Sequence, residues 1–167
     1  FRKILMKISL FLLLALPIFA QSNYIETIKG TLNVTIETNI DMTFISNLNK
    51  YRNIYSISDF NKNSDSNLIA LLKTTPNVLY YCFFGTPLSN SELELLSVRS
   101  NILGMTLLGL EISDDAICAL IKSNPNLKIF NVFETPGIGE RSMKALQHLN
   151  APRLIDIRNS GITNEAY

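Results

Sequence analysis

A helix, a turn and a strand are encoded in the stretch ISDDAICALIKSNPNLKIFNV, Ile112–Val132. It opens with Ser113, a residue of the type that caps helix N-termini, and apolar residues three and four apart follow, as in a helix that buries one side. After a corner at Pro125, apolar and polar residues alternate as they do in a half-buried strand. The stretch therefore predicts one supersecondary unit, and its recurrence along the chain decides the architecture.

The strand-like part of this unit recurs at a nearly constant interval. The second inward-facing apolar residues of the successive strands are separated by 24, 25 and 25 residues: Phe83, Leu107, Val132 and Ile157. Each copy contains a corner, an alternating strand and a turn with a polar helix-capping residue, and an incomplete copy begins at Ala151. Because one copy cannot bury its apolar face alone, stacked copies are expected to share one core.

Toward the N-terminus the pattern becomes weaker. Residues 52–75 match the following copy at a shift of 24, but Asp59 stands in the slot that Phe83 occupies there. Irregular first units are expected where an array needs a cap at its open end. We therefore predict an irregular N-terminal cap or degenerate first repeat over residues 21–51, and repeats of 24–25 residues over residues 52–167, the last one truncated.

These units resemble leucine-rich repeats, which have a frame L-x-x-L-x-L, a polar turn residue and a period of about 20 to 29 residues. The turns ISDDAI (112–117) and ITNEAY (162–167) match the form that opens the helix in strand-plus-helix repeats, such as those of ribonuclease inhibitors and F-box proteins. The copies depart from that family in having aromatic residues and Ile where Leu is usual, and an extra residue at Pro136–Gly137.

The resemblance implies an α/β fold, a leucine-rich-repeat solenoid with a parallel strand on the concave side and a helix on the convex side of each repeat. An ordinary α/β domain with alternating elements is the alternative.

The first twenty residues have the composition of a secretory leader. Met6 is a natural start, Lys7 follows it, and an apolar run over residues 8–20 ends in the small residue Ala20. The run is shorter than the roughly 20 apolar residues that span a bilayer. We therefore predict a signal peptide over residues 1–20 and a secreted or extracytoplasmic mature protein. A buried N-terminal helix and a membrane anchor are the alternatives.

Charge and residue types argue against several classes of function. Without the leader the chain has 12 basic and 14 acidic residues and no basic run, so nothing indicates nucleic-acid binding. The only histidine, His148, is expected to be a solvated helix residue, and acidic residues such as Asp114, Asp115 and Glu140 stand where helix N-termini favour them. We predict no catalytic residues, no metal site and no cofactor, and therefore a protein that is not an enzyme.

The side chains on either side of each inward pair should form columns on the exposed face of the sheet. One column comprises Phe60, Phe84, Leu108, Phe133 and Arg158, and a neighbouring column comprises Ser56, Tyr80, Gly104, Ile129 and Leu154. Large exposed apolar residues mark interaction sites. The predicted protein-binding residues are Phe60, Tyr80, Phe84, Leu108, Ile129, Phe133 and Arg158. A register error of one residue would instead place this column in the core.

The function predicted from these observations is a secreted protein–protein recognition scaffold that binds a protein ligand on its concave face. No nucleic acid is expected as a partner, nor a membrane once the leader is removed, and the oligomeric state is not indicated. The alternative is an N-terminal structural or capping segment of a larger surface or adhesion protein. Cys82 and Cys118 are expected to remain unbridged, because strand and helix residues lie on opposite sides of such a layer.

Overall fold

The computed structural model describes residues 23–28, 31–48, 50–51, 53–62 and 67–160; the predicted signal peptide lies outside these residues. The strands are β1 (Tyr24–Ile28), β2 (Thr31–Ile36), β3 (Ile54–Asp59), β4 (Tyr80–Phe84), β5 (Gly104–Leu108), β6 (Ile129–Phe133) and β7 (Leu154–Arg158). The helices are α2 (Met42–Leu48), α3 (Leu68–Thr74), α4 (Asn90–Ser97), α5 (Asp114–Ser123) and α6 (Glu140–Ala145), which continues into the 3₁₀ turn η1 (Leu146–His148).

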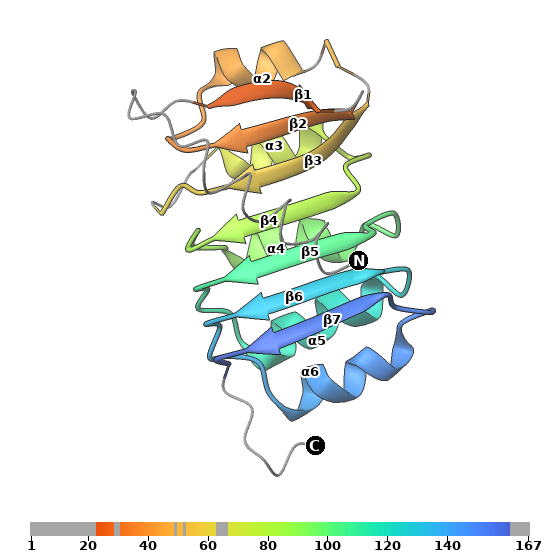
Figure 1. Ribbon diagram of the computed structural model, residues 1–167. Helices are drawn as coiled ribbons and strands as arrows, with labels where there is room; N and C mark the ends of the chain where they lie inside the picture. Colours follow the sequence, from red (N-terminus) through yellow and green to blue (C-terminus); the bar gives the residue numbers. More distant parts are fainter. Residues whose placement is uncertain (1–22, 29–30, 49, 52, 63–66, 161–167) are drawn as a thin grey trace.

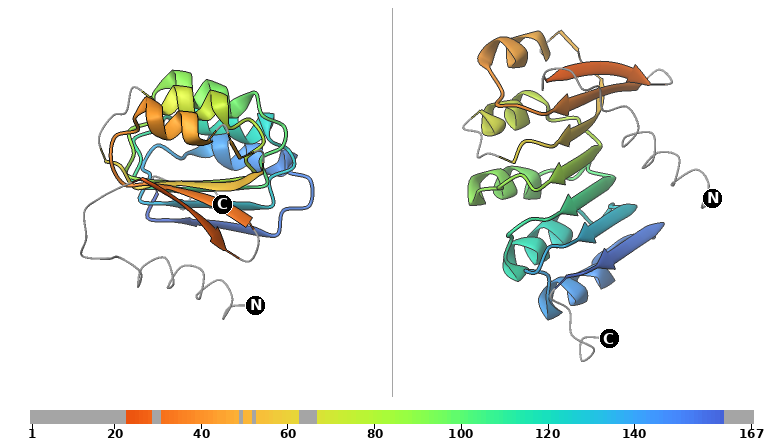
Figure 2. Two further views of the ribbon diagram at one scale, coloured as in Figure 1. Left: turned by 90° about the horizontal axis from the view of Figure 1, so that it is seen from above. Right: turned by 60° about the vertical axis from the view of Figure 1, so that its left-hand side comes forward.

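The strands form one sheet in which sequence order and spatial order are the same, from β1 to β7. The pair β1–β2 is antiparallel and every later pair is parallel. The described helices all cover the same face of the sheet, and the other face is free of helices in the described part of the chain (Figures 1 and 2). The predicted α/β class is confirmed, whereas the antiparallel β1 within the predicted cap was not foreseen.

From β3 to β7, strand pairing joins residues that are 24 or 25 positions apart. Phe83 pairs with Leu107, Leu107 pairs with Val132, and Val132 pairs with Ile157. The first three of these residues are fully buried, which confirms the inward positions expected from the alternation. Residues in equivalent slots of the sequence therefore lie side by side in the sheet and pack on the helices behind it.

Asp59, the exception in the sequence pattern, occupies the inward slot beside Phe83 and is fully buried. Its Oδ1 accepts a hydrogen bond from the backbone N–H of Asn61 at 2.8 Å, and its backbone carbonyl accepts one from the Thr86 hydroxyl at 3.2 Å. The carboxylate thus stabilises the turn after β3, as Asp side chains commonly do. A buried acidic side chain is accommodated here because it serves the backbone of its own turn.

Three polar residues at equivalent positions tie the C-terminal ends of the helices together. They are Thr75, Arg99 and Asn124, all buried. Each bonds a carbonyl four residues before it: Thr75 to Leu71 at 2.8 Å, Arg99 to Leu95 at 3.2 Å and Asn124 to Leu120 at 2.9 Å. The regular hydrogen-bond pattern of a helix stops at its last carbonyls, and these buried side chains supply donors there.

Arg99 and Asn124 also reach the preceding helix. The Arg99 guanidinium donates to the carbonyl of Leu72, and the Asn124 amide donates to the carbonyl of Leu96 at 3.3 Å. Leu72 and Leu96 are themselves equivalent positions, 24 residues apart. Neighbouring helices are therefore linked by the same contact, made in one case by a cation and in the next by a neutral amide.

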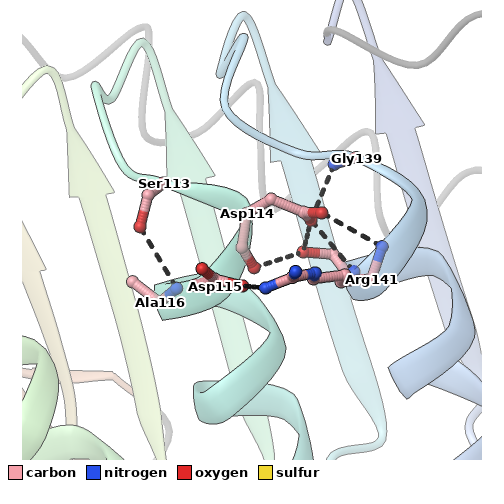
Figure 3. Close-up of polar contacts among 7 residues, drawn as sticks. Ser113, Asp114, Asp115, Ala116, Gly139 and Arg141 are labelled. Atoms are coloured by element: carbon pink, nitrogen blue, oxygen red, sulfur yellow. Dashed lines mark hydrogen bonds and ion pairs between the residues drawn. The ribbon is translucent and has the colours of Figure 1, made fainter.

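Asp114 lies in the first turn of α5 and was expected to stabilise the start of that helix, but it bonds the start of α6. Helix α5 is capped by Ser113, whose hydroxyl accepts from the N–H of Ala116 at 3.3 Å. The side chain of Asp114 turns instead toward the start of the next helix, α6 (Figure 3). The reason lies at Gly139, the N-cap position of α6, which has no side chain to accept a hydrogen bond.

The Asp114 carboxylate binds the start of α6 through several donors. It accepts from the backbone N–H groups of Gly139 and Ser142, each at 2.9 Å, and of Arg141 at 3.0 Å, and from the Ser142 hydroxyl. Asp115 forms an exposed ion pair with Arg141 beside this cluster. Desolvation raises the pKa of Asp114, but the hydrogen bonds outweigh it and hold the pKa below its ordinary value of 3.8.

Replacing Asp114 by alanine should destabilise the protein by about 1–2 kcal/mol, the usual effect of losing a helix cap, because three N–H groups of α6 lose their acceptor. Asp115→Ala is the matched control. It removes an ion pair whose side chains are both 70% exposed, and such pairs contribute at most about 1 kcal/mol. Urea unfolding at pH 7 measures both, and an equal loss in the two variants would contradict the capping role.

The same bonds predict an acid dependence. Because the pKa of Asp114 is lower in the folded state, its stabilisation is complete above the ordinary value of 3.8 and is lost as the pH falls through the folded pKa. The difference in stability between the wild type and Asp114→Ala should therefore shrink as the pH falls below about 4. A difference that stays constant down to pH 2 would show that the carboxylate charge is not involved.

Candidate functional site

The candidate site is the face of the sheet opposite the helices, which we call the open face (Figure 2). Strand pairing arranges its side chains in three columns across the strands. The Phe60 column comprises Phe60, Phe84, Leu108, Phe133 and Arg158; the central column comprises Ser58, Cys82, Thr106, Asn131 and Asp156; the Tyr80 column comprises Ser56, Tyr80, Gly104, Ile129 and Leu154. From β3 to β7 the open face is thus a regular array in which each strand contributes one residue to each column, with Phe60 directly after the end of β3.

The structure brings all seven predicted binding residues together on the open face. Arg158 is exposed, and the six apolar and aromatic residues are half-buried: Phe60, Tyr80, Phe84, Leu108, Ile129 and Phe133. Their neighbours Phe83, Leu107 and Val132 are in the core, so the strands do not have the alternative register that would have placed the column inside. Whether these residues bind a protein stays a prediction.

Within the Phe60 column the aromatic rings lie against their neighbours. The rings of Phe60 and Phe84 are parallel to within 3° with centroids 4.4 Å apart, and the Arg158 guanidinium lies 4.7 Å from the centroid of Phe133. These contacts run from strand to strand, and each covers one face of an aromatic ring in the column. A ligand approaching the sheet would therefore meet the apolar edges of the rings.

In the Tyr80 column the ring of Tyr80 packs over Gly104, which has no side chain. A β-carbon added to Gly104 would collide with the ring of Tyr80, so the absence of a side chain at Gly104 leaves the space that this ring fills. The other neighbour of Tyr80 is Tyr55, with ring centroids 4.8 Å apart. Burial and a hydrogen bond to Tyr80 raise the pKa of Tyr55 to about 12. Tyr55 was not predicted from the sequence as a residue of this face, because alternation along β3 assigns it to the same side as the buried Ile57.

The central column consists of small, uncharged side chains from β3 to β6. The amide of Asn131 donates to the Thr106 hydroxyl at 3.3 Å, and burial raises the pKa of the half-buried Cys82 thiol, which lies between Ser58 and Thr106. Charge enters only on β7, where Asp156 accepts two hydrogen bonds from Arg158 at 2.8 and 2.7 Å. Across β3–β6, all three columns of the open face are therefore without a charged side chain.

The histidine and the two cysteines lie in different parts of the layer. His148 is exposed in η1, on the helix side of the layer, as expected. Cys82 lies on the open face, whereas Cys118 belongs to α5, and both are free thiols. Cys118 is buried on the helix side of the sheet.

The described residues contain no group of three or more His, Cys, Asp or Glu side chains arranged to hold a metal ion. Among them there is also no helix with the length and apolar character needed to cross a membrane.

In comparisons with known proteins, no protein-family model and no curated protein matches this chain.

Adjacent phenylalanines on β4 give a direct test of which side chains form the core. Phe83→Ala should lower the free energy of unfolding by roughly 3–5 kcal/mol, because Phe83 is fully buried. Phe84→Ala should lower it clearly less than Phe83→Ala, because the Phe84 side chain is only half-buried. Urea denaturation of the two variants measures the difference, and a loss at Phe84 as large as that at Phe83 would contradict the assignment of Phe84 to the open face.

Proposed function

We propose that this chain is a leucine-rich-repeat-type solenoid that recognises a protein ligand through the open face of its sheet and catalyses no reaction. The observation that carries the proposal is a sheet face that the described helices leave uncovered. From β3 to β6 its three columns contain no charged side chain, and most residues of its two outer columns are large and apolar or aromatic. Parallel sheets ordinarily have both faces covered, because the crossover connections place helices on both sides. A parallel sheet covered on one face only is the arrangement that a one-sided repeat array would produce.

Three features support the solenoid. Consecutive strands are always neighbours in the sheet, the pairing from β3 to β7 keeps a step of 24 or 25 residues, and equivalent polar residues link successive helices. The open face of this sheet would be the concave side of such an array. The predicted leader supports secretion of the mature protein.

The open face has the composition of a recognition surface. Aromatic anchors contribute most of the binding energy in protein interfaces when a partner buries them. Phe60, Phe84 and Phe133 each lie against a neighbouring side chain, which limits the rotamers open to them and so reduces the conformational entropy lost when a ligand binds.

One observation favours the second candidate, a structural segment of a larger surface or adhesion protein. Ile155 pairs with the fully buried Phe130, yet it is 38% exposed on the helix side of β7, and Ile157 is half-buried there. A further unit packed on β7 would cover both residues. The two candidates are compatible if the open face binds its ligand within such a larger assembly.

The proposed recognition predicts that capture of a partner depends on the open face. The full chain, immobilised, should retain a partner from the extracellular protein fraction of its source, and Phe84→Ala combined with Phe133→Ala should reduce the retained amount at least tenfold. The matched control is Val98→Ala, which removes an apolar side chain that is 75% exposed away from the open face. Quantitative mass spectrometry compares the three proteins, and capture that is equally strong in the double variant would refute recognition by this face.

A further inference from the structure

An irregularity in the sheet brings the side chains of Tyr55 and Tyr80 together. Two consecutive residues of β2 pair with Ile54 and Ser56 on β3, which leaves Tyr55 between them as an extra residue. An extra residue of this kind re-aims a side chain. Tyr55 therefore lies against the ring of Tyr80 on β4, although alternation along β3 would have directed it to the core.

The two rings are in direct contact across neighbouring strands (Figure 1). Their centroids are 4.8 Å apart and their planes are inclined by 32°. On its other side the Tyr80 ring packs over Gly104, where a β-carbon would collide with it, so the ring is confined between Gly104 and Tyr55. Within the part of the chain that the structure describes, no other two tyrosine rings are in contact.

The reactive positions of the two rings lie on the same side of the pair. A hydrogen bond links Tyr55 to Tyr80, and the hydroxyl is the only hydrogen-bonding group of each side chain. The ring carbons next to the hydroxyls, the ortho carbons, are therefore close to one another. These are the carbons at which two phenoxyl radicals join. Tyr55 is 37% exposed, so an oxidant in the solvent can reach the pair.

From this geometry we propose that Tyr55 and Tyr80 form a site of oxidative cross-linking, at which a haem peroxidase with hydrogen peroxide joins the two rings as dityrosine. Each ring gives up one electron and its phenolic proton, and a carbon–carbon bond forms between one ortho carbon of each ring. The hydrogen atoms on those two carbons then move to the oxygens and restore both phenols. Hydrogen peroxide accepts the two electrons and two protons and leaves as two molecules of water.

The link fastens β3 to β4 and joins residues that are 25 positions apart in the sequence. A cross-link restricts the unfolded chain and so stabilises the folded state. It acts on the strand whose inward slot holds the buried Asp59 in place of an apolar side chain. The proposed export places the pair in an oxidising compartment, whereas recognition of a ligand by the open face is not required for this chemistry.

Oxidation of the full chain with hydrogen peroxide and a haem peroxidase tests the site. Tyr55→Phe and Tyr80→Phe keep each ring but remove the hydroxyl from which a phenoxyl radical forms. Tyr51→Phe is the matched control, because Tyr51 is 41% exposed and lies outside the pair. Dityrosine fluorescence, intact mass and denaturing electrophoresis follow the product. After tryptic digestion, peptide mapping should find residues 53–62 joined to residues 74–99.

We expect the wild type and Tyr51→Phe to form one dityrosine per monomer, with a mass lower by two hydrogen atoms and a higher urea midpoint. Tyr55→Phe and Tyr80→Phe should form at least tenfold less of it. Circular dichroism before oxidation establishes that the variants are folded; if Tyr80→Phe is not, Tyr55→Phe alone decides.

Three results would overturn the site: no dityrosine in the wild type, dityrosine that persists in Tyr55→Phe, or dityrosine that joins only separate molecules. An unchanged urea midpoint in the cross-linked protein would overturn the stabilising effect of the link.

Discussion

The pairing of residues 24 or 25 positions apart is the constraint on which the rest of the structure depends. It places Phe83, Leu107 and Val132 beside one another on the helix side of the sheet, where all three are fully buried. Because side chains alternate along a strand, the same pairing fixes which residues face away from the helices. A shift of one residue would exchange the two faces, so the core and the candidate site are determined together.

Polar contacts between successive helices reinforce this pairing at both ends of the layer. Arg99 and Asn124 bond carbonyls of the preceding helix, and Asp114 caps the helix that follows its own. These contacts add hydrogen bonds from a neighbouring unit at the helix ends, where the regular helical pattern of bonds stops. Each unit thus depends on its neighbour for hydrogen bonds as well as for burial, which explains why the sheet and the helices keep the same step.

The sequence predicted the parts of the fold that follow from periodicity. Alternation and helical spacing placed the strands β4–β7 and the inward residues, because side-chain direction has a fixed period in each element. The columns of the open face follow from the same period once the strands are aligned. The α/β class is therefore readable from the chain, whereas the leucine-rich-repeat solenoid and the role of the open face stay predictions.

Features that depend on contacts between units could not be predicted in this way. Asp114 caps α6 because Gly139, which belongs to a different unit, has no side chain to do so. The preference of acidic residues for helix starts does not tell which of two neighbouring helices such a residue will cap. The fit of Tyr80 over Gly104 likewise requires knowing that the two lie on adjacent strands. Asp59 broke the apolar pattern because its role is to bond the backbone of a turn, which hydrophobic periodicity does not report.

The most direct measurement of the strand register is an engineered disulfide across the open face. Cys82 pairs with Thr106 on the neighbouring strand, at a spacing of about 4.8 Å that falls within the Cα separation of disulfides. In a Cys118→Ala background, Thr106→Cys should form an intramolecular bond with Cys82 on mild oxidation. Leu108→Cys, two residues further along the same strand face, should not form it. Mass spectrometry should find a disulfide from Cys82 in the Thr106→Cys variant and none in the Leu108→Cys variant. No disulfide in the Thr106→Cys variant, or equal formation in both variants, would contradict the register.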